Sequence, residues 1–76
     1  MLDAEIVGRV IGRIREQQGK SQELISGLAG IGRTHLSAIE RGQRKPTLET
    51  FYKIAEALGI KPSVIVAAIE EELENK

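Results

Sequence analysis

The side chains that could take part in chemistry in this 76-residue chain are mostly cationic groups and hydroxyls rather than catalytic groups. There is no cysteine, which excludes a disulfide and a thiolate metal site, and a single histidine, His35, excludes a multi-histidine site. No acid pair stands in a catalytic motif, and Gly30-x-Gly32 follows a predicted helix rather than a strand, so it is not a dinucleotide fingerprint. We therefore expect no enzyme, no metal site and no cofactor.

The charged residues are unevenly distributed along the chain. Eleven Lys and Arg balance eleven Asp and Glu, so the formal net charge is zero. Between Arg9 and Lys61, however, ten basic residues stand against five acids, a balance of +5, whereas residues 1–8 contribute −2 and residues 62–76 contribute −3. Because the local field decides what docks where, the central region suits an anionic partner although the net charge is zero.

Five short helices are predicted to position these groups, because apolar residues recur at three- and four-residue spacing and no segment alternates like a strand. Asp3, Ser21 and Thr47 are suitable N-caps, and Pro62 suits a first helical position. The predicted helices cover about residues 3–18, 22–29, 33–41, 47–58 and 62–74. The sequence thus predicts an all-α, compact five-helix domain over residues 1–76.

The apolar spacing also predicts which helix faces turn inward. The inward positions are Ile6, Val7, Val10, Ile11 and Ile14 in the first helix and Leu48, Phe51, Ile54, Ala55 and Leu58 in the fourth. Gly8 and Gly12 each cost the first helix roughly 1 kcal/mol relative to alanine. Their four-residue spacing permits close helix contact, which is a weak signal in a soluble helix.

The second and third predicted helices, joined by a tight turn containing Gly30, have the shape of a helix-turn-helix. The motif residues are Ser21-Gln22-Glu23, Ala29-Gly30-Ile31-Gly32-Arg33-Thr34 and Ile39-Glu40-Arg41-Gly42, followed by Lys45-Pro46-Thr47-Leu48 and Ile54-Ala55-Glu56-Ala57-Leu58-Gly59. Together they closely resemble the Cro/C1-type (XRE) helix-turn-helix family, over roughly residues 8–66. The chain is also similar in size to restriction–modification controller proteins and small phage-type repressors.

This resemblance implies a set of DNA-contacting residues. The start of the third helix enters the major groove in that family, which implies base reading by Arg33, Thr34, Ser37 and Ala38. Arginine can donate two hydrogen bonds to guanine O6 and N7, worth about 1–3 kcal/mol of discrimination. Phosphate contacts are implied for Gln22, which in that family also braces the third helix, and for His35, Arg41, Arg44 and Lys45, the last three in a basic loop. The alternative for each is an exposed, solvated side chain.

The resemblance implies a structural role for Glu40, because an acid beside DNA would be repelled. Arg15 occupies the family position that pairs with this acid, so we expect an Arg15–Glu40 ion pair that braces the first helix against the third. Removing one partner alone should cost more stability than removing both.

Three departures from the family pattern predict a less stable motif. Gly32 replaces the usual Ser or Thr N-cap of the third helix and offers no side-chain acceptor. Lys20 stands where an apolar residue is usual, and Ser26-Gly27 replaces better helix formers.

The last predicted helix carries more apolar surface than a small domain needs. Its run Val64–Ile69 is six residues long, far shorter than the roughly 18–20 that span a bilayer. We expect Ile65, Ile69 and Leu73, broadened by Val66, to contact a second copy, so that a homodimer reads a roughly palindromic operator. The alternative is a monomer whose last helix completes the core.

The sequence therefore favours a DNA-binding transcriptional regulator whose partner is double-stranded DNA. The alternative is an antitoxin whose main partner is a protein toxin. No sensor domain follows the motif, so no small-molecule ligand is expected. Asp3 and Glu5 stand where a signal peptide would carry positive charge, so we expect a cytoplasmic protein.

Overall fold

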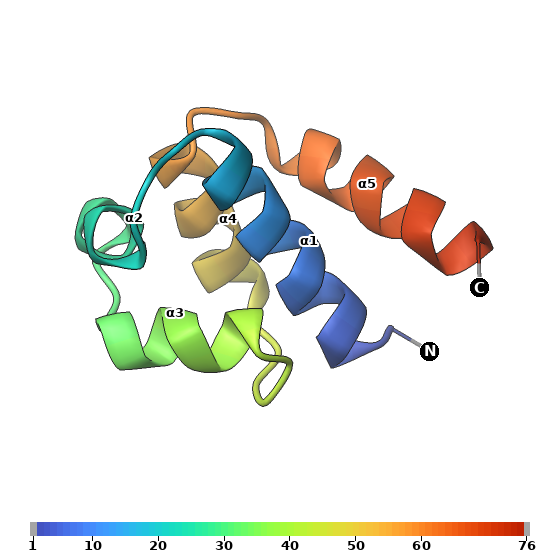
Figure 1. Cartoon of the computed structure of the whole chain (residues 1–76), viewed down its shortest axis with the longest axis horizontal. Coiled ribbons are helices and arrows are strands. Elements are labelled where there is room, and N and C mark those ends of the chain that lie inside the picture. Colours follow the sequence, from blue (N-terminus) through green and yellow to red (C-terminus); the bar gives the residue numbers. More distant parts are fainter. Residues whose placement is uncertain (1, 76) are drawn as a thin grey trace.

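The computed structural model describes residues 2–75, and its regular elements in this range are five α-helices. They are α1 (Ala4–Gln17), α2 (Gln22–Ala29), α3 (Arg33–Glu40), α4 (Leu48–Ala57) and α5 (Pro62–Glu74), as Figure 1 shows. The predicted all-α five-helix fold is confirmed, and every predicted helix end lies within one residue of the observed one. None of the helices within residues 2–75 combines the length and apolar character that a membrane crossing requires.

Short-range hydrogen bonds account for where the helices begin. The predicted N-caps Asp3, Ser21 and Thr47 each accept a backbone N–H two or three residues further on, over 2.8, 3.0 and 3.1 Å. Gly32, the N-cap of α3, makes no side-chain hydrogen bond, as predicted. Gly30 ends α2 at a φ of +71°, a left-handed conformation that glycine adopts without a Cβ penalty, and it turns the chain from α2 into α3.

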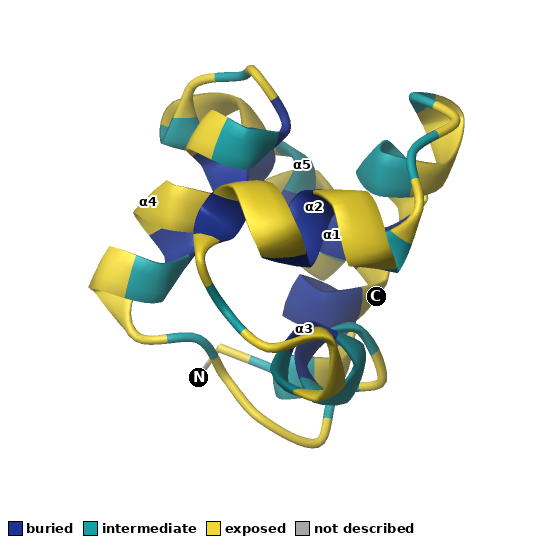
Figure 2. Cartoon of the chain, turned by 90° about the vertical axis from the view of Figure 1, so that its left-hand side faces the viewer, coloured by how far each residue is buried: buried dark blue, intermediate teal, exposed yellow. Residues whose placement is uncertain are grey.

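The core lies where one face of each helix meets the others. Its side chains without measurable exposure are Val10, Ile11, Ile25, Leu36, Ile39, Ile54, Ala55 and Ile65. In Figure 2 the buried residues of α1, α2 and α4 lie at the centre, while the outer turns of α2 are exposed. The prediction that Leu48 faces inward is wrong: Leu48 is 74% exposed, because it begins α4 before that helix reaches the core.

The backbones of α1 and α3 lie in contact at Gly8. A Cβ at this position would overlap the carbonyl oxygen of Ile39 and lie 2.8 Å from that of Glu40. A Cβ on Gly12, one turn further along α1, would lie 3.2 Å from Oε1 of Glu40. The two glycines therefore allow α3 to lie directly against α1. Their four-residue spacing was only a weak signal of so close a contact.

Helix α5 lies on the side of α1 away from α3 (Figure 1). Its Glu72 accepts a hydrogen bond from Nη1 of Arg13 at 3.0 Å and lies 3.8 Å from Nε of Arg9. Both arginine side chains are about half exposed, so these ion pairs contribute little to stability. These ion pairs do affect where the positive charge lies, because they direct Arg9 and Arg13, two basic residues of the central stretch, toward α5 and not toward α3.

Candidate nucleic-acid interface

The outward face of α3 and the first residue of α2 together form a hollow lined by hydrogen-bond donors. Arg33, Thr34 and Ser37 follow one another along this face of α3, and Arg41 directly follows the helix; with Gln22 they line a hollow of about 270 Å³. Two guanidinium groups, one amide and two hydroxyls can donate into it, and no acid lines it. Elsewhere in the described chain, no group of three His, Cys, Asp or Glu side chains could hold a metal ion. The hollow therefore suits an anion or the acceptor edge of a base.

The other predicted DNA-contacting residues lie around this hollow rather than in it. His35 and Ala38 are partly buried on the flanks of α3. Arg44 and Lys45 are exposed in the loop after α3, and Lys45 borders a different groove beside α5. The structure thus brings Gln22, Arg33, Thr34, Ser37 and Arg41 together, and it leaves the four others at the margin.

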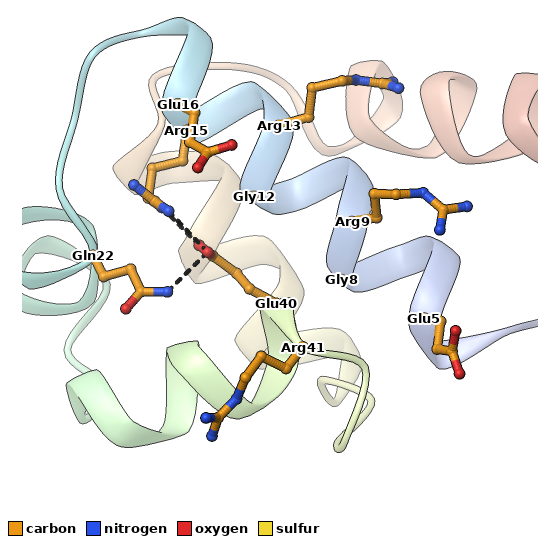
Figure 3. Close-up of a pocket in the computed structure, with 10 residues that line it drawn as sticks. All are labelled: Glu5, Gly8, Arg9, Gly12, Arg13, Arg15, Glu16, Gln22, Glu40 and Arg41. Carbon is orange, nitrogen blue, oxygen red and sulfur yellow. Dashed lines mark hydrogen bonds and ion pairs between the residues drawn. The ribbon is translucent and has the colours of Figure 1, made fainter.

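Arg15 and Glu40 form a two-point ion pair between α1 and the last residue of α3 (Figure 3). Nε of Arg15 donates to Oε2 of Glu40 over 2.7 Å, and Nη2 donates to Oε1 over 3.0 Å. The side chains are only 12% and 9% exposed. The hydrogen-bonded carboxylate raises the pKa of the Arg15 guanidinium above its ordinary value, because it stabilises the charged form. Nη1 of Arg15 also donates to the carbonyl of Lys20, over 2.7 Å, so the pair reaches the α1–α2 connection.

The third member of this group is Gln22; the resemblance implied that it braces the third helix, but not that its partner is Glu40. Its Nε2 donates to Oε1 of Glu40 over 2.9 Å and connects the start of α2 to the end of α3 (Figure 3). Both residues belong to the motif quoted above, but they are 18 positions apart and no local spacing signals the contact.

Two of the four residues predicted for a dimer contact are buried within the chain. Ile65 has no exposed surface and Ile69 retains 4%, because α5 needs both to cover the core. The prediction that Ile65 contacts a second copy is therefore wrong, and Ile69 has only a small exposed surface left for such a contact. Val66 and Leu73 remain 43% and 36% exposed.

Val66 and Leu73 border an apolar groove of about 280 Å³, here called the α4–α5 groove. Its lining residues are Leu2, Val7, Lys45, Pro46, Leu48, Phe51, Val66, Ile69, Glu70 and Leu73. Leu2, which the sequence did not indicate for any contact, and Leu48, which was predicted to face the core, are 48% and 74% exposed at its edge. Exposed apolar surface gathered in one groove is typical of an interaction site.

The fold and the donor-lined face of α3 define a helix-turn-helix protein, and comparison with known proteins agrees. The helix-turn-helix family model matches residues 11–65. An uncharacterised HTH-type transcriptional regulator of Sinorhizobium fredii is 36% identical over 67 residues, covering 88% of this chain and 87% of that protein. The control protein C.BamHI of Bacillus amyloliquefaciens is 36% identical over 58 residues, covering 75% and 72%. The chain belongs to the Cro/C1-type (XRE) family of helix-turn-helix transcriptional regulators.

Solved structures of restriction–modification controller proteins share the fold. C.AhdI from Aeromonas hydrophila matches with a TM-score of 0.81 and 34% identity, covering 86% of this chain and 98% of that one. C.Esp1396I matches with a TM-score of 0.91 and 26% identity, covering 100% and 99%. A tetramer of C.Esp1396I in complex with its natural 35 base-pair operator matches with a TM-score of 0.86 and 28% identity, covering 95% of each chain.

Proposed function

We propose that this regulator binds double-stranded DNA sequence-specifically, with α3 in the major groove. The observation that carries the proposal is the hollow between Gln22 and the outward face of α3, where Gln22, Arg33, Thr34, Ser37 and Arg41 can all donate hydrogen bonds and no acid lines the surface. The operator complex of the similar protein C.Esp1396I supports it.

The donors divide by their place on α3. Arg33 and Thr34, exposed at its first turn, reach furthest toward base edges, and Ser37 and Ala38 follow one turn later. Gln22 at the start of α2 and Arg41 just after α3 contact phosphates. His35, Arg44 and Lys45, which lie around the hollow, make further phosphate contacts. Phosphate contacts fix the position of α3, and base contacts supply the specificity.

The first prediction concerns Arg33. We expect the wild-type chain to enrich a roughly palindromic sequence from a random DNA pool. Arg33→Ala should lose the preference for one base in each half-site, at a cost of about 1–3 kcal/mol per lost contact. Arg13→Ala is the matched control, because it removes the same charge on the α5 side of the molecule. If Arg33→Ala enriches the same bases as the wild type with weaker binding, Arg33 contacts the backbone only.

We further propose a homodimer formed through the α4–α5 groove, in place of the buried line Ile65 and Ile69. The groove offers Leu48, Val66 and Leu73, which the single chain leaves exposed. Lys45 and Pro46 border it, so a second copy docked there would lie beside the loop after α3 rather than over the hollow. A twofold dimer of this kind reads two half-sites about one turn of DNA apart.

Sedimentation equilibrium tests the dimer. Val66→Glu and Leu73→Glu should each shift a micromolar dimer to monomer, because a carboxylate would be buried without a partner. Leu28→Glu is the control: Leu28 is 61% exposed on α2 and does not line the α4–α5 groove, so this variant should remain dimeric. A wild-type chain that sediments as a monomer at these concentrations contradicts the proposed dimer.

A further inference from the structure

The carboxylate of Glu40 joins three helices although Glu40 itself ends α3. Its side chain is turned toward α1 and the start of α2, and it is only 9% exposed (Figure 3). Oε2 accepts from Nε of Arg15, while Oε1 accepts from both Nη2 of Arg15 and Nε2 of Gln22, over 3.0 and 2.9 Å. Glu40 is therefore held by Arg15 and in turn holds Gln22.

This arrangement determines which way the Gln22 amide is turned. An ionised carboxylate only accepts hydrogen bonds, so Gln22 must present its nitrogen to Glu40 and turn its carbonyl oxygen away, as Figure 3 shows. One N–H is then used by Glu40 and the second remains. Gln22 also lines the donor-lined hollow with Arg33 and Arg41.

We infer that Glu40 is a positioning residue for DNA binding, which acts by orienting the Gln22 amide toward a backbone phosphate. The inference rests on the proposed DNA-binding function. Phosphate, like carboxylate, only accepts hydrogen bonds, so an amide turned the other way would present its oxygen to the phosphate and repel it. Glu40 prevents this turn, and it touches no DNA itself.

The test must separate this role from the contribution of Glu40 to folding. The double variant Arg15→Met/Glu40→Met removes the acceptor of Gln22 while the net charge stays the same, and apolar replacement of both partners of a buried ion pair is well tolerated. Gln22→Met removes the amide directly. Urea unfolding of each variant gives its folded fraction, so that DNA affinities are compared between folded molecules.

On the sequence enriched by the wild type, we expect the double variant and Gln22→Met each to bind about tenfold more weakly, which is typical of losing one hydrogen bond to a charged group. A variant that combines Gln22→Met with Arg15→Met/Glu40→Met should bind no more weakly than the double variant or Gln22→Met alone. Duplexes with single methylphosphonate substitutions add a second measurement. One position that weakens wild-type binding should have no effect in the double variant, whereas the other sensitive positions stay sensitive. If the double variant does not fold, Glu40→Gln is measured in the same way, because its neutral amide no longer imposes one orientation on Gln22.

A double variant that binds and responds to every methylphosphonate like the wild type, while Gln22→Met is weakened, overturns the positioning role and leaves the DNA-binding function standing. A Gln22→Met variant with wild-type affinity also overturns the positioning role, because Gln22 then makes no phosphate contact that contributes to DNA affinity. A wild-type chain that binds no duplex overturns the proposed function itself.

Discussion

Replacing Gly8 with alanine is expected to destabilise the protein by about 3 kcal/mol, the upper range for overpacking a close-packed contact. The added Cβ would overlap the carbonyl oxygen of Ile39 and lie 2.8 Å from that of Glu40. Both are backbone atoms that cannot rotate away, so α1 and α3 must separate. Since alanine normally favours a helix over glycine by about 1 kcal/mol, the predicted loss has the opposite sign to the intrinsic propensity. Urea unfolding followed by circular dichroism measures it.

Gly27→Ala is the matched control for Gly8→Ala. Gly27 also lies inside a helix, but a Cβ there would meet nothing within 4 Å. It should therefore gain about 0.5–1 kcal/mol of stability. If both substitutions raise stability by similar amounts, the backbones of α1 and α3 are not in contact at Gly8.

The second large effect is expected at the buried ion pair. Arg15→Met alone, or Glu40→Met alone, should cost about 3–5 kcal/mol, because each leaves a charge in a poorly hydrated place without its partner. The double variant should recover most of this loss. A double-mutant cycle of unfolding free energies, measured in urea, checks the coupling between the two residues.

Losses that simply add in the double variant would contradict this coupling.

The pKa of Arg15 is raised in the folded chain, so the stability that depends on its charge is present at every pH below the ordinary arginine pKa and is lost only in strong alkali. The single-variant losses should thus be the same at pH 7 and at about pH 9.

The helices and their ends could be predicted because the signals for them are local. Asp3, Ser21 and Thr47 cap N–H groups two or three positions away, and Gly30 takes a left-handed conformation within a single residue. Such features depend on the order of neighbouring residues and on little else.

The direction in which α5 turns its apolar residues could not be predicted in the same way. Its apolar residues are consecutive, so every face of the helix is apolar and no periodicity shows which one packs inward. The buried line proved to be Ile65 and Ile69, leaving Val66 and Leu73 for the α4–α5 groove. Leu48 was misplaced because helical spacing does not show where a helix first meets the core.

Contacts between distant residues of the motif were also beyond local pattern. The family resemblance suggested the ion pair between Arg15 and Glu40. The spacing, however, did not indicate that Gln22 contacts the same carboxylate, and it indicated the backbone contact at Gly8 only weakly. The charge balance of +5 likewise counted Arg9 and Arg13, which the structure directs toward Glu72 of α5. The cationic character near α3 therefore depends on fewer residues than the sequence balance indicated.

The most direct test of sequence-specific binding by α3 compares the affinities for two duplexes. Both are measured at one salt concentration, because phosphate contacts make the affinity for any duplex depend on salt. The wild-type chain is titrated into the duplex that it enriches and into a scrambled duplex of the same length and composition, at about 150 mM salt. We expect the enriched duplex to bind at least about a thousandfold more tightly, as specific regulators do. Equal affinity for the two duplexes would contradict this expectation.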